Sequence, residues 1–216
     1  MVVQLQALIK KATWMHTIKK TGFALTMMMA AAATHAQDRS TDPLQRITQC
    51  FRGGEFHAEG TYRLSESVVS RQVDTATGPM RVSIDDGYRM MVYRKSTAPL
   101  VNLLIERSAA GQFASDRDAI ARHTAALAAG SQPPEQVAVE NSVLNGIDII
   151  AINKPPMDTS GVISMIQLFD ATTGTIATAH VLNQQGPARE FNSAAEYAVL
   201  RDRFIGALSA CMARKF

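Results

Sequence analysis

The fold is decided by one strand-like stretch, Val162-Ile163-Ser164-Met165-Ile166-Gln167-Leu168-Phe169. Alternate residues of a strand point to opposite faces. Here each face carries three apolar side chains: Val162, Ile166 and Leu168 on one, and Ile163, Met165 and Phe169 on the other. Residues 147–152 have the same character, and a strand that is apolar on both faces needs cover on both. We therefore expect an α+β fold in which helices flank both faces of an antiparallel sheet, an α/β/α sandwich.

Strand patterns continue on both sides of this stretch. Asn145-Gly146 is the strongest kind of short hairpin signal and predicts that residues 137–143 pair with 147–152. Residues 162–169 and 175–182 form a second expected hairpin. Before them, residues 62–107 predict an antiparallel meander, in which turns are expected at 74–79 and at Asp85-Asp86-Gly87.

Capping signals predict three helices. Asp42-Pro43 combines an N-cap with a proline at the first helical position, and it begins a short helix. Ser115-Asp116-Arg117-Asp118 resembles a capping box for a helix that runs to Ala129, with an expected buried stripe of Ile120, Thr124 and Leu127. Ser193-Ala194-Ala195-Glu196 is a capping box, and apolar residues follow it at helical spacing: Tyr197, Leu200, Phe204, Leu208 and Cys211.

The first 36 residues predict where the protein works. Four lysines precede an apolar run over 22–33, and Thr34-His35-Ala36 offers small residues at the two positions that a signal peptidase reads. We expect a secretory signal peptide at 1–36 and a single α+β domain at 37–216. The run is shorter than the roughly 20 residues that cross a bilayer, which argues against an uncleaved anchor. Met15 offers a compact alternative start to the leader.

The positive net charge belongs to this expected leader. The whole chain has 22 basic and 19 acidic residues, and four of the basic ones are leader lysines, so 18 basic residues remain against 19 acidic. A nucleic-acid-binding protein needs clustered cations on one face, and no dense run of Lys or Arg occurs after residue 37. We therefore expect no nucleic-acid partner, and no stable membrane anchor after cleavage.

Two cysteines remain in the expected mature chain, Cys50 and Cys211. In an oxidising compartment such a pair predicts a disulfide, which would hold the first helix against the last. The alternative, a catalytic thiolate with a His partner, lacks a recognisable motif around either residue.

Candidate chemistry is sparse. His57 and Glu59 lie two residues apart on an expected strand, so their side chains share one face and could supply two metal ligands. A tight metal site needs three or four ligands. We expect no metal, no cofactor and no catalytic residues. No Ser-hydrolase motif or nucleotide-binding loop occurs, so pairing His180 with a serine has no support.

Two features are candidates for ligand binding or for buried polar interactions. Asp148 interrupts an apolar strand, so it must be paired or carry a raised pKa, and a salt bridge is the favoured interpretation. Arg89, Arg94 and Lys95 lie close to Tyr88 and Tyr93, and they form either an anion-binding patch or a solvated strand face.

The element order of residues 88–216 resembles the Mog1/PsbP-like sandwich fold: a strand pair, a helix at 116–129, a meander over 137–182 and a long terminal helix. The cysteine-bearing first helix departs from that pattern. The resemblance implies a non-enzymatic binding or assembly protein, and no motif carries over functional residues.

We therefore expect a periplasmic or secreted binding or accessory protein of the cell envelope, which acts on a protein partner or a small ligand. One specific version is a periplasmic immunity protein that neutralises a toxin. The alternative from another class is an exported hydrolase with an unfamiliar site. An acidic or Arg-lined cleft that contains Asp148 or His180 would favour the enzyme, and a flat or apolar exposed patch would favour the binding protein.

Overall fold

The computed structural model of the protein describes residues 42–65, 68–131, 137–153 and 161–214, so the expected leader lies outside the described residues. The helices of this part are α1 (Pro43–Gln49), α2 (Phe113–Ala129) and α3 (Ala194–Met212), with a 3-10 turn, η2, at Gly186–Ala188. Its strands are β1 (His57–Ser65), β2 (Val69–Thr75), β3 (Gly78–Tyr93), β4 (Val101–Ser108), β5 (Ala138–Leu144), β6 (Ile147–Asn153), β7 (Gly161–Asp170) and β8 (Thr175–Asn183).

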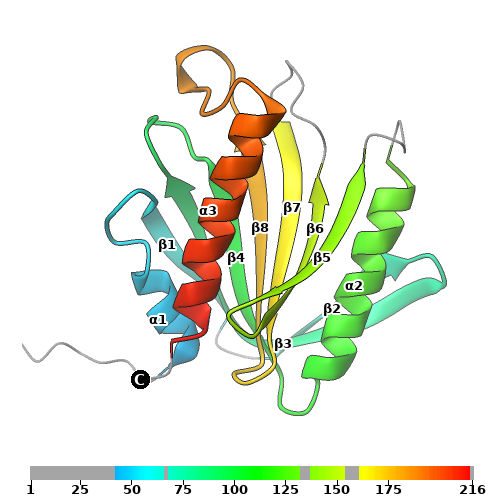
Figure 1. Cartoon of the computed structure of the whole chain (residues 1–216). Coiled ribbons are helices and arrows are strands. Elements are labelled where there is room, and N and C mark those ends of the chain that lie inside the picture. The colour runs from blue at the N-terminus through cyan, green and yellow to red at the C-terminus, as the bar shows by residue number, and fades with distance from the viewer. Residues whose placement is uncertain (1–41, 66–67, 132–136, 154–160, 215–216) are drawn as a thin grey trace, which may run out of the picture. The chain divides into compact units, whose positions relative to one another are not determined.

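These strands form one antiparallel eight-stranded sheet in the order β1-β3-β4-β8-β7-β6-β5, with β2 also paired to β3 (Figure 1). The long strand β3 takes two partners along the same edge. Its first half pairs with β2, from Gly78 opposite Thr75 to Ile84 opposite Val69, and its second half pairs with β1. The β2–β3 hairpin therefore extends beyond the sheet as an arm.

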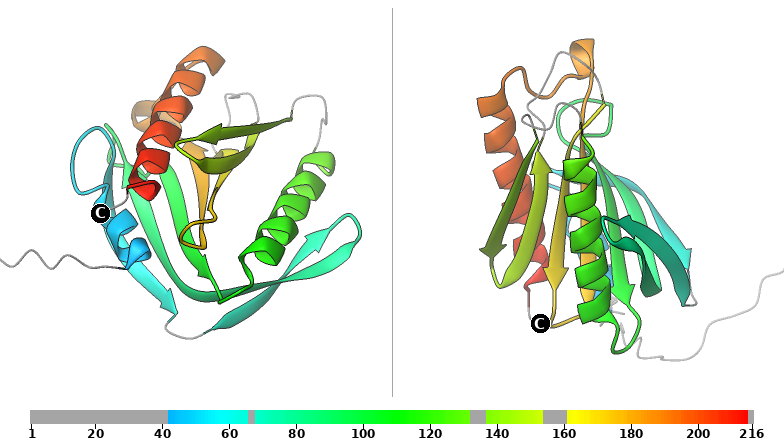
Figure 2. Two further views of the ribbon diagram at one scale, coloured as in Figure 1. Left: turned by 60° about the horizontal axis from the view of Figure 1, so that its bottom comes forward. Right: turned by 90° about the vertical axis from the view of Figure 1, so that its right-hand side faces the viewer.

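Helices cover both faces of the sheet, as the apolar strands predict. Helices α1 and α3 pack on one face, over the larger hydrophobic core. Helix α2 packs on the other face, where Ala119 and Ile120 meet Val82 and Ile84 of the β2–β3 arm. Figure 2 shows α3 and α2 on opposite sides of the sheet, with the arm lying against α2.

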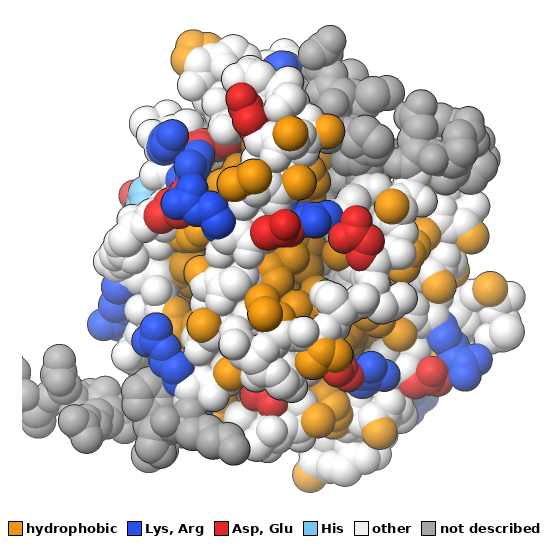
Figure 3. Space-filling view, viewed as in Figure 1, with side chains coloured by type: hydrophobic (Ala, Val, Ile, Leu, Met, Phe, Trp, Pro, Cys, Tyr) orange, Lys and Arg blue, Asp and Glu red, His pale blue; other side chains and the backbone are white. Residues whose placement is uncertain are grey.

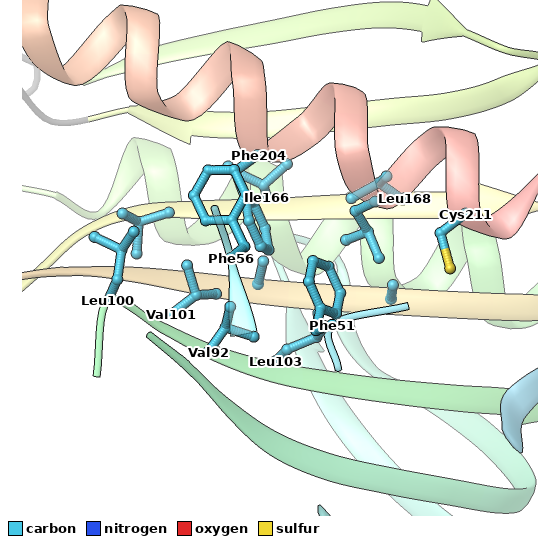
Figure 4. Close-up of a cluster of buried hydrophobic side chains, with 14 of the residues drawn as sticks. Phe51, Phe56, Val92, Leu100, Val101, Leu103, Ile166, Leu168, Phe204 and Cys211 are labelled. Atoms are coloured by element: carbon cyan, nitrogen blue, oxygen red, sulfur yellow. The ribbon is translucent and has the colours of Figure 1, made fainter. Parts of the chain in front are cut away.

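The core beneath α3 is closed by a disulfide and three aromatic rings. Cys50 and Cys211 are bonded, with Cα atoms 6.2 Å apart, so the predicted disulfide is confirmed. The ring of Phe204 stacks on Phe51 at 5.8 Å and meets the edge of Phe56 at 5.4 Å. Figure 4 shows these rings together above the apolar side chains of the sheet. The disulfide thus fixes the chain directly after α1 to the last turn of α3.

Two of the three predicted helix starts are confirmed by their caps. The Asp42 carboxylate accepts a hydrogen bond from the backbone N–H of Leu44 at 3.1 Å. The Ser193 hydroxyl accepts one from the N–H of Glu196 at 3.2 Å, which closes the predicted capping interaction of α3.

The capping prediction for α2 is wrong. The helix begins at Phe113, and its N-cap residue, Gln112, makes no side-chain cap. The buried Asp116 carboxylate instead accepts a hydrogen bond from the N–H of Ser83 on β3 at 2.9 Å. Leu127 is exposed, and Ala128 takes its expected place in the buried stripe. Ser115, the expected N-cap, lies inside the helix and donates a hydrogen bond to the carbonyl oxygen of Gln112 at 2.8 Å.

The predicted turn at Asp85-Asp86-Gly87 is also wrong, because the segment continues β3. The register shifts between Ile84 and Asp86 against β4, which marks a bulge. Asp86 is buried and bound by Arg63 through two hydrogen bonds of 3.1 and 2.9 Å. A Cβ at Gly87 would lie 3.2 Å from the carbonyl oxygen of Ile105, so glycine permits the close approach of β4.

The predicted hairpin at Asn145-Gly146 is confirmed. Asn145 has φ 56° and Gly146 has φ 79°, the positive values that a two-residue type I′ turn requires. Strands β5 and β6 pair without interruption from Leu144 opposite Ile147 to Ala138 opposite Asn153.

Candidate binding surface

Asp148 has the partner that its sequence context calls for, but it is not buried. Its Oδ2 lies 2.7 Å from Nη2 of Arg117 on α2, and the two side chains are 45% and 40% exposed. The strand next to it, β5, is exposed along its whole length. Asp148 therefore occupies a position one strand from the sheet edge, and it forms a partly solvated ion pair.

Arg94 is a structural cation. Its guanidinium donates to Glu55 at 2.7 Å and to Glu190 at 3.3 Å. Glu190 also accepts hydrogen bonds from the backbone N–H groups of Lys95 at 3.1 Å and Ser96 at 2.9 Å. Burial opposes ionisation of Glu190, but these donors outweigh it and lower the pKa of that carboxyl. Arg94 is therefore fully engaged, whereas the Lys95 side chain is exposed.

Arg89 does not join Arg94. It belongs to a row of cross-strand partners that runs across one face of the sheet: Tyr62, Arg89, Leu104, Thr178 and Gln167. Thr124 of α2 donates a hydrogen bond to Gln167 at 2.5 Å, which identifies this face as the one that α2 covers. Arg94 pairs instead with Glu55, which also contacts Arg203 of α3. The structure therefore separates the two arginines, and they form no common anion-binding patch.

A second row of partners lies beside the first on this face: Met91, Asn102, His180 and Met165. The side chains of both rows become more exposed to solvent from β7 toward β1. Thr178 is buried, whereas Met91 is 38% exposed and Tyr62 is 64% exposed. Part of the α2 side of the sheet is therefore open, and we refer to Tyr62, Arg89, Met91, Asn102 and His180 as the open face.

The open face combines apolar surface with a few polar groups. Burial, and then the neighbouring Arg89 cation, lower the pKa of His180, which favours its neutral imidazole. The Asn102 Oδ1 is buried and has no hydrogen-bond partner within the described chain. Arg89 is exposed and makes no ion pair with the described residues. Tyr, Met and Arg are enriched in protein interfaces, which suits this composition to protein binding.

Apolar exposure continues from the open face along the sheet edge. Leu64, Val68 and Val69 are exposed large hydrophobic residues on β1, β2 and the segment between them. Glu59 is an exposed carboxylate opposite Met91 at the rim. Together these residues make an apolar border with one acid beside the open face.

The histidines show no metal-binding arrangement in the part of the chain that the structure describes, where no group of three or more potential ligands gathers. His57 stacks on Tyr93, its cross-strand partner, with ring centroids 5.9 Å apart. The Nδ1 of His123 lies 2.6 Å from the carbonyl oxygen of Asp74.

Two surface grooves lie away from the open face. One, of about 390 Å³, lies between the chain after α1 and helix α3, and its lining includes the disulfide, Phe51, Phe56, Glu55 and Arg203. The other, of about 380 Å³, lies between the β2–β3 turn and α2. Neither is lined by Asp148 or His180.

On the α3 side of the molecule, basic and acidic side chains lie next to one another (Figure 3).

No family model, curated protein or solved structure matches the chain. The resemblance to the Mog1/PsbP-like fold therefore stays a prediction, and the candidate surface rests on the geometry alone.

The sequence pointed to Arg89 and His180 but not to Tyr62, Met91 or Asn102. An aromatic residue within the polar run Glu59–Arg63 was the available signal for Tyr62. Its significance depends on the pairing of β1 with β3 and of β3 with β4, which only the folded sheet shows.

Proposed function

We propose that this chain is an exported, disulfide-linked binding protein of the cell envelope that captures a protein partner on the open face. The observation that carries the proposal is the exposed trio Tyr62, Arg89 and Met91, which lies on one face of the neighbouring strands β1 and β3. Exposed aromatic and Arg side chains that lie together are typical of binding hot spots.

The chemistry of the open face defines the partner. Arg89 is a cation without an ion pair among the described residues, and Tyr62 and Met91 offer apolar surface on either side of it. A protein segment that presents a carboxylate between apolar side chains complements this arrangement. His180, whose neutral form is favoured by its lowered pKa, then provides a hydrogen-bonding group beside the ion pair.

The same geometry gives less support to the hydrolase alternative. Asp148 is aligned through Phe169 with Ile176, four residues from His180 on β8. At about 3.3 Å per residue, this places the two groups about 13 Å apart along the strand direction. The Asp148 carboxylate is also occupied by Arg117. The two groups of a catalytic pair must lie within hydrogen-bonding distance of each other, and Asp148 and His180 do not.

Export is supported by one structural feature besides the expected leader. The Cys50–Cys211 disulfide is typical of an oxidising compartment. The leader and the disulfide together favour the periplasm or the outside of the cell. Separately, no helix among the described residues is long and apolar enough to cross a membrane.

Photocrosslinking in the native envelope tests the proposal. A photoreactive residue, p-benzoylphenylalanine, replaces Tyr62 in one variant and the exposed Val199 of α3 in a matched control. We expect a discrete protein adduct from position 62 that is absent from position 199, and Arg89→Ala should weaken it at least tenfold. Equal adducts at both positions, or an adduct indifferent to Arg89→Ala, would refute the proposed surface.

A hydrolase screen of wild type and His180→Ala supplies the second arm. Turnover of an ester, peptide or glycan by wild type, lost in a His180→Ala variant that keeps its melting temperature, would replace the binding proposal with the enzyme.

A further inference from the structure

Strand β5 is an edge strand with an unusually accessible outer side. All seven of its residues are exposed, and its inner side pairs with β6 without a break. Within the described chain, no strand pairs with the outer side of β5. Its unpaired backbone N–H and C=O groups are therefore a template for another strand.

Natural proteins usually protect such an edge with Pro, Lys or a bulge. The sequence of β5, Ala-Val-Glu-Asn-Ser-Val-Leu, contains neither residue, and its register with β6 shows no bulge. By contrast, β1 at the opposite end of the sheet has two register irregularities. The single charge of β5, Glu140, is neutralised by Arg201 of α3 at 3.1 Å. The β5 edge is thus left open to pairing.

We propose that the β5 edges of two copies of this chain pair with each other, antiparallel, about a twofold axis at Asn141. The pairing would join two eight-stranded sheets into one continuous sheet. It uses an edge remote from Tyr62 and Met91, so it does not rest on the proposed function.

The sequence of β5 is nearly palindromic about Asn141, and this selects the register. Val139 of one copy faces Val143 of the other, and Ala138 faces Leu144, so apolar side chains meet apolar side chains. Glu140 faces Ser142, so no like charges lie directly opposite each other. A slip of one residue would turn the opposite face of the strand toward the same side of the sheet, so the nearest alternative registers shift the pairing by two residues. One of them places Glu140 opposite Leu144, and the other places Ala138 opposite Ser142. Each therefore sets a polar side chain against an apolar one.

The size of this contact predicts how tightly the copies associate. Seven paired residues per copy make an interface smaller than the roughly 1,200–2,000 Å² of a stable complex. However, Val139 and Val143 are already exposed and would be covered on pairing. We therefore expect a reversible, concentration-dependent dimer.

Cysteine cross-linking tests the register. Directly opposed Cα atoms lie about 4.5–5.5 Å apart in an antiparallel pair, which suits a disulfide. Asn141→Cys should therefore form a disulfide-linked dimer under mild oxidation. Two copies of Val143→Cys should not, because their thiols would be four residues, or about 13 Å, apart along the strand.

A mixture of Val139→Cys and Val143→Cys should cross-link although neither does so alone. We expect Asn141→Cys to react at least tenfold faster than Val143→Cys in the exported protein. Equal rates, or faster reaction of Val143→Cys, would overturn the register.

Sedimentation of uncross-linked protein tests the interface itself. Val143→Lys should abolish the dimer by placing a cation in the apolar pair, whereas Val68→Lys should leave it unchanged. The two valines are matched controls, since their exposures are 68% and 63% and they lie at opposite edges of the sheet. A wild-type protein that stays monomeric at every concentration, or a dimer that survives Val143→Lys, would refute the proposal.

Discussion

Replacing both cysteines, Cys50→Ala with Cys211→Ala, should lower the free energy of unfolding while leaving the fold intact. The bond joins residues 161 positions apart, so it closes a loop that contains the whole sheet. The chain-entropy model gives about 5 kcal/mol for such a loop, and measured effects are usually about 2–4 kcal/mol. Leu44 and Ile47 remain buried against the core, so α1 should stay docked without the bond.

Urea unfolding monitored by circular dichroism measures this change. We expect a loss of about 2–4 kcal/mol and a steeper dependence on urea, because the unlinked unfolded chain exposes more surface. Hydrogen exchange of α1 provides the control. If α1 loses its protection while the global stability stays unchanged, the bond acts locally on the helix, and the argument from the unfolded chain is refuted.

Three further predictions use single substitutions or pH, measured by unfolding. Phe204→Ala should lower the free energy of unfolding by about 3–5 kcal/mol, because it empties the space beside the rings of Phe51 and Phe56. Val199→Ala, at an exposed position on the same helix, should change it by less than about 0.5 kcal/mol. Equal effects would contradict the packing of Phe204. Asp148→Asn should cost less than about 1 kcal/mol, because its ion pair with Arg117 is partly solvated; a loss above 2 kcal/mol would show that the pair is effectively buried. Burial raises the pKa of Tyr197 from 10.0 to about 12, so the folded state favours the neutral phenol. About 2–3 kcal/mol of stability should therefore be lost as the pH rises from 10 to 12. Tyr197→Phe should remove that part of the loss, and an unchanged pH profile in this variant would contradict the assignment to Tyr197.

Local signals predicted the elements whose chemistry is completed within a few residues. Asp42 caps α1 through Leu44, only two residues away, and Ser193 caps α3 through Glu196. The Asn145-Gly146 turn needs only its own positive φ values. The apolar character of both strand faces likewise predicted that helices cover both sides of the sheet, because burial follows from composition.

Features that depend on distant partners could not be predicted in the same way. Ser115 resembles a cap but lies inside α2, and its neighbour Asp116 bonds to Ser83, 33 residues earlier in the chain. The segment around Asp86 resembles a turn, but its carboxylate is bound by Arg63 of a neighbouring strand. Arg89 became a candidate through its neighbours in sequence, and its real surroundings come from β1, β4 and β8.

If the chain is exported as proposed, the long covalent loop between Cys50 and Cys211 sets an order of events during export. A chain that crosses a membrane from its N-terminus would deliver Cys50 first, and its only partner thiol would emerge after the eight strands of the described chain. The first cysteine would then wait in the reduced form, or as a mixed disulfide with an oxidant, until the sheet has arrived. With only two cysteines in the chain, no incorrect intramolecular pairing competes, so closure of this bond marks the completed arrival of the domain.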